Sequence, residues 1–333
     1  MTTLVTGATG LVGLNVVNQL SKRGEKIRVL ARPTSNGIGF VKKFGAEVVS
    51  GDVTDPASVK RAMGGVRRVY HVAGVVGGKW KEKQMWAVNV RGTENICKAA
   101  LEENVEGFVH TSSTAAVATG TLDKPANEET PYDLDRVKSP YHTTKHKGEE
   151  LVLGFAKKGL PAKVVNPSTM FGPWDVKPTS GLILQIIAKR GIPFYTTGSN
   201  NFIDVEDAAL GHLLAMEKGR VGQRYILGNQ NMAWKEFLTL VSEVVGKRPP
   251  KAKLIKPVAL AVAYLAAPLS KRSTGALAWL DPATVRGAFA HHCVDPSKAR
   301  RELGLPRTPV REAVEKEYRW LKENGYLNGG PRK

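Results

Sequence analysis

The sequence has few cysteines, few aromatic residues and no long hydrophobic run. The two cysteines, Cys97 and Cys293, match neither a disulfide framework nor a zinc site, so we expect a reducing, cytoplasmic setting. The longest apolar stretch, residues 258–269, contains Pro268 and is shorter than the roughly 20 residues of a membrane-spanning helix. We expect no signal segment before the first predicted strand. These absences favour a globular protein that its own core stabilises.

Acidic residues are also scarce. Thirty Asp and Glu against 49 Lys and Arg give a formal net charge of +19 over 333 residues. Such an excess can favour nucleic acid, anionic membranes or phosphorylated ligands. The basic residues are scattered and no nucleic-acid-binding motif accompanies them, so we interpret the charge as a solvated surface and predict no nucleic-acid partner.

Short β-branched runs alternate with helical patterns over residues 1–167. The predicted strands cover residues 3–6, 26–30, 47–49, 68–72, 107–111 and 162–166. This alternation predicts a Rossmann-type, doubly wound parallel sheet. Residues 168–330 predict a smaller, mostly helical substrate-binding part, with helices near 181–190, 204–218, 234–245 and 309–324. A strand near 223–228 is expected to join the core, so the two parts interleave.

A glycine-rich loop follows the first predicted strand. Gly7, Gly10 and Gly13 are three apart, directly before and within the first predicted helix. Glycine permits a tight turn, close approach of a pyrophosphate, and close packing of helix on strand. The first helical N–H groups then face the phosphates. The loop predicts a dinucleotide site formed by Gly7, Thr9, Gly10, Leu11, Val12 and Gly13.

The end of the second predicted strand bears on the choice of dinucleotide. Folds that prefer NAD place an acidic residue about 20 positions past the glycines. Arg32 stands there, followed by Thr34 and Ser35. A guanidinium can pair with a 2′-phosphate that an acid would repel, so we predict NADP, with NAD as the alternative. Asp52 and Val53, after the third strand, are placed to hydrogen-bond the adenine.

Tyr141 and Lys145 are four residues apart, on one face of a helix that Ser139 and Pro140 begin. A phenol near pKa 10 transfers protons poorly at neutral pH. A neighbouring lysine cation, helped by an oxidised nicotinamide, would lower that pKa. The pattern becomes specific together with the Thr111-Ser112-Ser113 run about thirty residues earlier. It predicts acid–base chemistry beside a dinucleotide.

With these motifs, the sequence resembles the extended short-chain dehydrogenase/reductase family, also called the NAD-dependent epimerase/dehydratase family. Further motifs of that resemblance, which spans nearly the whole chain, are residues 71–73, 89–93 and 166–168. Within it, the sequence is similar to the dihydroflavonol-4-reductase-like and 3β-hydroxysteroid-dehydrogenase-like branch. It is most similar to the hopanoid-associated sugar epimerase-like group, through residues 31–35, 166–169, 172–179 and 224–228.

The resemblance implies a role for each matching residue. Tyr141 would be the general acid/base, Lys145 would bind the nicotinamide ribose and tune the phenol, and Ser113, in preference to Ser112, would hold the substrate carbonyl. Asn89 is either structural or holds a water in a proton relay. Further cofactor-binding positions would be Ala73, Gly74, Thr111, Ser112, Pro167 and Ser168. Family analogy also implies a homodimer built from helices around residues 82–103 and 140–158.

Three functions follow from these features. The favoured one is an NADP-dependent reductase or dehydrogenase that moves a hydride between nicotinamide C4 and a carbonyl or secondary alcohol of a largely apolar small molecule. The alternatives are an NAD-dependent sugar or sugar-nucleotide epimerase and a sensor that only binds NADP. Arg32 disfavours the epimerase, and the presence of Ser113, Tyr141 and Lys145 disfavours the sensor.

Some features admit an ordinary structural interpretation. Four aromatic residues follow predicted strands and are candidate substrate contacts, although packing explains them as well: Trp80, Trp86, Phe171 and Trp174. The apolar helix over residues 257–269 is a lid, a buried or subunit-interface element, or a membrane contact, and membrane contact is not favoured. Adjacent His291 and His292 point apart beside Cys293, so we predict no metal site.

Overall fold

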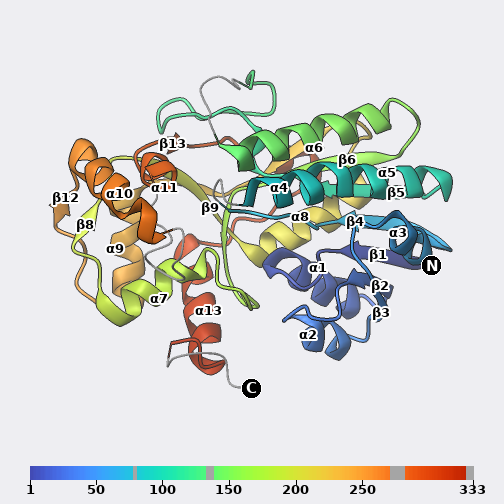
Figure 1. The fold of residues 1–333 in the computed structure, drawn as a ribbon, viewed down its shortest axis with the longest axis horizontal. Coiled ribbons are helices and arrows are strands. Elements are labelled where there is room, and N and C mark those ends of the chain that lie inside the picture. The colour runs from blue at the N-terminus through green and yellow to red at the C-terminus, as the bar shows by residue number, and fades with distance from the viewer. Residues whose placement is uncertain (78–80, 133–138, 271–281, 328–333) are drawn as a thin grey trace.

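Seven strands form the central sheet of the molecule (Figure 1). The computed structural model describes residues 1–77, 81–132, 139–270 and 282–327. The strands are Thr2–Thr6 (β1), Lys26–Ala31 (β2), Glu47–Ser50 (β3), Val66–His71 (β4), Gly107–Thr111 (β5), Ala162–Pro167 (β6) and Arg224–Leu227 (β10). They run parallel in the order β10-β6-β5-β4-β1-β2-β3. The predicted parallel sheet is confirmed.

The sheet is buried at its centre, which explains the composition of its strands. Every residue of β5 and β6 is buried, as expected where helices cover both faces of a parallel sheet. The strand expected near 223–228 is β10, which pairs with β6 so that Arg224 lies opposite Val164. A strand from the C-terminal half thus completes the edge of the N-terminal sheet.

Helices cover both faces of this sheet (Figure 1). Helices α1 (Leu11–Lys22) and α8 (Val205–Lys218) pack together on one face, and α2 (Ile38–Lys43) lies beside α1. The other face carries α3 (Pro56–Met63), α5 (Thr93–Glu102) and α6 (Pro140–Ala156). Two hydrophobic cores result, one on each side of the strands.

The helix predicted around residues 82–103 is not uniform. It consists of α4 (Glu82–Met85), a π-helical segment η2 (Trp86–Gly92) and then α5. A π-helical turn inside an α-helix frequently marks a functional position. Both η2 and α5 pack against α6. A subunit contact made by these helices stays a prediction.

The C-terminal part contains more strand than the sequence predicted. Its helices are α7 (Gly181–Arg190), α9 (Trp234–Val244), α10 (Lys256–Ser270), α11 (Pro282–Ala288), α12 (Ser297–Leu303) and α13 (Val310–Glu323). A second sheet joins β7 (Thr169–Phe171), β9 (Ser199–Asp204), β11 (Gln230–Ala233) and β13 (His291–His292), and β8 (Phe194–Tyr195) pairs with β12 (Ala252–Lys253). Most of these strands have only two to four residues, and β9 begins with the polar run Ser199-Asn200-Asn201, so none shows the alternation that identifies a strand in a sequence.

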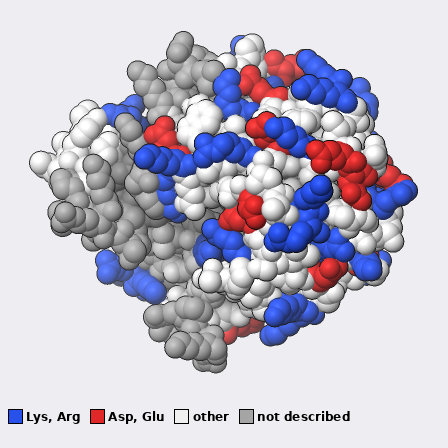
Figure 2. Space-filling view, turned by 45° about the vertical axis from the view of Figure 1, so that its right-hand side comes forward, with Lys and Arg blue, Asp and Glu red and all other residues white. Residues whose placement is uncertain are grey.

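The surface agrees with the scattered charge of the sequence. On the face shown in Figure 2, Lys and Arg side chains are interspersed with Asp and Glu. None of the helices in the described part of the chain has the length and apolarity needed to cross a bilayer.

Candidate active site

The loop between β1 and α1 requires glycine at two of its three positions. Gly7 has a φ of +67°, and a Cβ there would lie 2.5 Å from the Ala73 backbone nitrogen. A Cβ at Gly13 would lie 2.2 Å from the Gly7 carbonyl oxygen. At Gly10 the nearest atom to an added Cβ would be Gly7 O, at 3.6 Å. Packing therefore explains Gly7 and Gly13, whereas Gly10 leaves an open surface that a phosphate can approach.

Helix α1 begins at this loop with N–H groups that no side chain caps. Its N-cap, Gly10, offers no acceptor, and the first turn carries no acidic residue. The positive end of the helix therefore faces the open surface of the loop. Leu11 and Val12 are partly buried, and the Thr9 carbonyl would lie 2.6 Å from a Cβ at Gly37, so the loop is held firmly. These residues fit the pyrophosphate of a dinucleotide.

Arg32 and Asp52 lie together at the carboxyl ends of β2 and β3. An Arg32 guanidinium nitrogen lies 3.8 Å from an Asp52 carboxylate oxygen, and the Arg32 side chain is 54% exposed. The other Asp52 oxygen accepts hydrogen bonds from the backbone and hydroxyl of Thr54. Thr34 is exposed, whereas Ser35 is buried. Arg32 therefore retains the freedom to contact an anionic ligand, because its pairing with Asp52 is long and exposed.

The end of β4 meets Asn89 and Lys145. A Cβ at Gly74 would lie 3.4 Å from Lys145 Nζ and 3.5 Å from Asn89 Oδ1. Lys145 Nζ donates to the Thr111 carbonyl oxygen at 2.7 Å. The glycine loop is close by, since the Ala73 backbone nitrogen nearly touches Gly7. Gly74, Asn89, Lys145 and the glycine loop therefore lie together at one edge of the sheet, at the carboxyl ends of its strands.

Tyr141 enters this edge from the first turn of α6. Ser139 has an extended backbone and Pro140 occupies the first helical position, which favours a helix start there. Ser113 makes a hydrogen bond to the Tyr141 hydroxyl, and its Oγ also accepts from the Ala115 backbone at 3.1 Å. That second bond caps the short helix η3 (Thr114–Ala116). The structure thereby brings Ser113, Tyr141 and Lys145 to one place.

Burial favours the neutral form of both the Tyr141 phenol and the Lys145 ammonium. It raises the pKa of Tyr141, and the hydrogen bond from Ser113 opposes this. It lowers the pKa of Lys145 to about 8, and the Glu149 carboxylate opposes this. The protein groups alone therefore do not give the lowered phenol pKa that the sequence led us to expect, because desolvation outweighs the other effects.

Asn89 connects the elements around Lys145 through its side chain, and both a structural and a proton-relay role stay predictions. Its side chain accepts from the Val75 backbone nitrogen at 2.7 Å and donates to Val75 O at 3.0 Å and to Thr144 Oγ1 at 3.2 Å. It is buried within η2, and its backbone carbonyl accepts from the Thr93 hydroxyl. Asn89 therefore joins the π-helical segment, the loop after β4 and α6, which hold Lys145 in position.

Two buried hydroxyls near the ends of β5 and β6 have no hydrogen-bond partner. They belong to Ser112 and Ser168, which directly follow Thr111 and Pro167. The Thr111 hydroxyl is bonded to His212 at 2.9 Å. Since buried polar groups normally find partners, these two serines fit a polar ligand at this edge.

The four aromatic residues named above as candidate substrate contacts differ in their surroundings. Trp80 lies outside the described residues, and Trp86 is partly buried in η2. Phe171 is 1% exposed and packs against Phe202 and Phe237 in the hydrophobic core. Trp174 packs edge-on against Phe40 and Phe44. The contacts of Phe171 and Trp174 are those of packing, and a substrate role for these aromatic residues stays a prediction.

Sequence reasoning missed one neighbour of the phenol. The rings of Tyr141 and His142 lie 6.0 Å apart, and the His142 ring lies 6.0 Å from that of His292 on β13. Burial, with the His292 imidazole beside it, lowers the pKa of His142 to about 4. In the sequence, the one sign that His142 lies near the site is its position directly after Tyr141.

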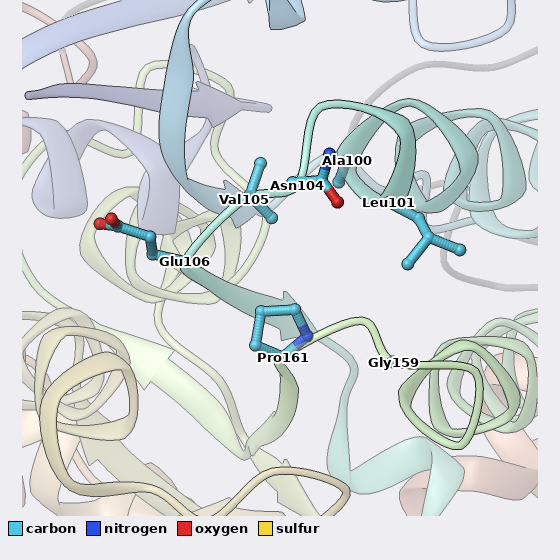
Figure 3. Close-up of a pocket in the computed structure, with 7 residues that line it drawn as sticks. All are labelled: Ala100, Leu101, Asn104, Val105, Glu106, Gly159 and Pro161. Atoms are coloured by element: carbon cyan, nitrogen blue, oxygen red, sulfur yellow. The ribbon is translucent and has the colours of Figure 1, made fainter.

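A shallow pocket of about 290 Å³ lies elsewhere (Figure 3). It is lined by Ala100, Leu101, Asn104, Val105, Glu106, Gly159 and Pro161. These residues precede β5 and β6 or end α5, so the pocket lies at the amino ends of the strands. Ligands of open parallel sheets bind at the carboxyl ends, where the glycine loop and Tyr141 lie.

Comparison with known proteins identifies the family of the chain. Residues 3–228 match the model of the NAD dependent epimerase/dehydratase family, which is more than half of the chain. The chain belongs to this family. The resemblance carried by the glycine loop, the serine run and the Tyr141–Lys145 pair is thus confirmed.

Individual relatives extend the family match over the C-terminal part. The "Putative dihydroflavonol 4-reductase" of Synechocystis is 32% identical over 97% of this chain and 95% of the relative. Sterol demethylase protein B of Methylococcus capsulatus is 32% identical over 98% and 100% of the two chains. The crystal structure of gox2253 is 36% identical, with a TM-score of 0.86 over 98% and 99%. The predicted dihydroflavonol-reductase-like branch is therefore confirmed.

Proposed function

We propose that this protein is an oxidoreductase that interconverts a carbonyl and a secondary alcohol of a largely apolar small molecule, with NADP(H) as its cofactor. When bound, the cofactor exchanges a hydride with the substrate carbon at nicotinamide C4. The observation that carries the proposal is the meeting of Ser113, Tyr141 and Lys145 at the edge of the sheet beside the glycine loop. Many relatives in the family are named as reductases or dehydrogenases, which supports an enzyme.

Each of the three residues has a task that its surroundings support. Tyr141 gives its hydroxyl proton to the substrate oxygen during reduction and takes it back during oxidation. Ser113, already bonded to that hydroxyl, holds the same oxygen. Lys145, with a pKa of about 8, stays mostly cationic at neutral pH and stabilises the phenolate.

NADP is favoured over NAD by the exposed guanidinium of Arg32. It lies at the end of β2, where an acid would repel a 2′-phosphate. Asp52 lies beside it, but the pair is long and solvent-exposed, so little free energy is lost when Arg32 turns to a phosphate. An apolar substrate is favoured by the names of the relatives, one of which is a sterol demethylase protein.

Replacing Tyr141 by Phe tests the proposed proton donor. We expect turnover to fall by about 10²–10⁴-fold, the usual contribution of a general acid, while the Kd for NADPH changes little. Turnover is measured by NADPH oxidation with a panel of ketones, flavonoids, steroids and sugar nucleotides. The Kd for NADPH is measured by fluorescence titration. Tyr264→Phe, at an exposed position on α10, is the matched control. Turnover that survives in Tyr141→Phe would show that the phenol is not the donor.

The family name keeps a sugar or sugar-nucleotide epimerase as the second candidate. An epimerase of this kind recycles a tightly held NAD. NAD that co-purifies with the protein, together with no net NADPH oxidation on any carbonyl of the panel, would select it. Free exchange with NADPH and substrate-dependent oxidation would select the reductase. NADPH binding without turnover on the panel, and without co-purified NAD, would leave the sensor.

A further inference from the structure

Helix α10 presents its large apolar side chains to solvent. Ile255, directly before the helix, is 62% exposed, and Val258, Val262 and Leu265 are 55%, 50% and 81% exposed. The spacing of 3, 4 and 3 residues places these four residues, the α10 stripe, along one face of the helix. Contiguous apolar surface of this kind marks an interaction site.

A neighbouring face of the helix attaches it to the protein through small residues. Ala259 and Ala263, which directly follow Val258 and Val262, are buried, and α10 packs against α11. On this helix two alanines are thus buried, while Val258, Val262 and Leu265 face solvent. Folding of the chain does not use the apolar area of the stripe, so that area remains available for a partner.

The described segment of the chain that carries the α10 stripe has charge of one sign. Residues 244–270 contain five basic residues and no Asp or Glu. Lys251, Lys253 and Lys256 are exposed directly before the helix and at its first residue. Strand β12, which carries Lys253, pairs with β8, where Phe194 is 49% exposed. In Figure 1 these elements lie together at the end of the molecule opposite β1–β3.

We propose that the α10 stripe, with its three lysines, is a docking surface for anionic lipid bilayers. The helix lies in the plane of the membrane, the four apolar side chains enter the interfacial region, and the lysines contact lipid phosphates. At 15 residues, or about 23 Å, the helix is too short to span the bilayer, which agrees with contact on one side. The proposal does not depend on the reaction proposed above.

Charge decides between a membrane and a second copy of the chain. In a symmetric dimer the patch would meet itself, so the lysines would face the same lysines with no acidic partner in residues 244–270. Like charges brought together in this way oppose association. An anionic lipid surface supplies the missing negative charge and an apolar layer at the same time.

Flotation of the full chain with vesicles tests the proposal. We expect the protein to float with phosphatidylcholine vesicles that contain phosphatidylglycerol at low salt, and to stay in solution with pure phosphatidylcholine. High salt should reverse the binding, because screening removes the attraction to the lysines. Failure to float with anionic vesicles at low salt would overturn the proposal.

Variants separate the stripe from the general positive charge of the protein. Val262→Glu with Leu265→Glu should abolish flotation, whereas Val221→Glu, 53% exposed before β10, should not. Gln at Lys251, Lys253 and Lys256 should weaken partitioning by about a hundredfold. Gln at three other exposed lysines, Lys22, Lys60 and Lys157, should have a much smaller effect. Equal losses in the two lysine sets would overturn the proposal, since net charge alone would then explain binding.

The oligomeric state of the same variants addresses the competing partner. Circular dichroism first establishes that Val262→Glu with Leu265→Glu folds. If this variant converts a dimer into a monomer and still floats with anionic vesicles, the stripe is a subunit interface and the proposal is wrong. An unchanged oligomeric state with lost flotation supports the lipid surface.

Discussion

At the scale of single residues, Arg32 shows how one side chain can select a cofactor. Its guanidinium is half exposed and 3.8 Å from the Asp52 carboxylate. At that distance and exposure the ion pair contributes little to stability. A 2′-phosphate carries more charge and accepts two hydrogen bonds from the same fork, so it should displace Asp52.

Arg32→Ser should therefore weaken NADPH binding and spare NADH. Loss of a charge-assisted contact of about 1.5–3 kcal/mol raises the Kd for NADPH by roughly 10–150-fold. The Kd for NADH should change by no more than about threefold, and fluorescence titration measures both. Arg61→Ser, exposed on α3, is the control. Equal weakening for the two cofactors would mean that Arg32 does not contact the phosphate.

At the scale of elements, two buried carboxyl groups fasten the loop after β7 to α13. Asp175 accepts from the backbone nitrogens of Thr179 and Gly181 at 3.0 and 3.1 Å, and Glu317 accepts from Gly172 at 3.1 Å. The two side chains are also hydrogen-bonded to each other. Since two adjacent buried carboxylates repel, we expect them to share one proton. Burial raises the pKa of Asp175 to about 6 and that of Glu317 well above its usual range.

This pair predicts a stability that declines towards alkaline pH. A group whose pKa is raised by folding stabilises the protein fully below its unfolded pKa, near 4, and loses that contribution as the pH rises. Glu317→Gln keeps an oxygen that accepts from the Gly172 backbone nitrogen, and its neutral amide does not need a proton to lie beside Asp175. We expect the variant to match the wild type near pH 4 and to exceed it at pH 8 by more than about 1.4 kcal/mol, one pKa unit.

Urea unfolding at both pH values measures this difference. Glu315→Gln, exposed on the same helix, should follow the wild type throughout. A variant less stable than the wild type at pH 8 would show that the carboxyls are not sharing a proton. Tyr326, whose pKa burial and Asp175 raise above its ordinary value near 10, titrates above the pH range of this test.

At the scale of the whole molecule, three buried histidines connect the two faces of the sheet. His71 on β4 bonds to Thr6 and Thr93 at 2.7 and 3.0 Å, and its ring stacks on His110 of β5 at 5.3 Å. His212 on α8 bonds to Thr111. Burial lowers all three pKa values, to about 3 for His71 and about 4 for His212. The folded protein therefore holds them neutral.

Acid should unfold the protein through these histidines. Below pH 6.5 these histidines bind protons in the unfolded chain but stay neutral in the folded one. The free energy of unfolding therefore falls, as the pH is lowered, by up to about 1.4 kcal/mol per pH unit for each histidine. His110→Leu removes one of them, along with a buried nitrogen that has no partner. The slope of unfolding free energy, averaged between pH 6.5 and 5, should lessen by roughly 1 kcal/mol per pH unit. His291→Gln, at an exposed position, should leave the slope as it is, and an unchanged slope in His110→Leu would contradict the argument.

Local sequence features predicted the sheet and the chemistry of its edge. The six strands of the N-terminal half were predicted to within two residues, because a buried parallel strand is a short β-branched run between turns. The spacing of Gly7, Gly10 and Gly13 and that of Tyr141 and Lys145 depend only on turn and helix geometry. Such features depend on neighbours along the chain, which the sequence displays directly.

Folding determined what depends on residues far apart in the chain. The second sheet, the bond between Ser113 and Tyr141, the raised phenol pKa, the carboxyl pair of Asp175 and Glu317 and the solvent-facing α10 stripe all belong to this group. Burial and long-range pairing arise when separate elements pack, and composition and periodicity carry no record of which faces meet. The chemical groups of the site could be read from the chain, but their protonation and the outward direction of α10 follow from its packing.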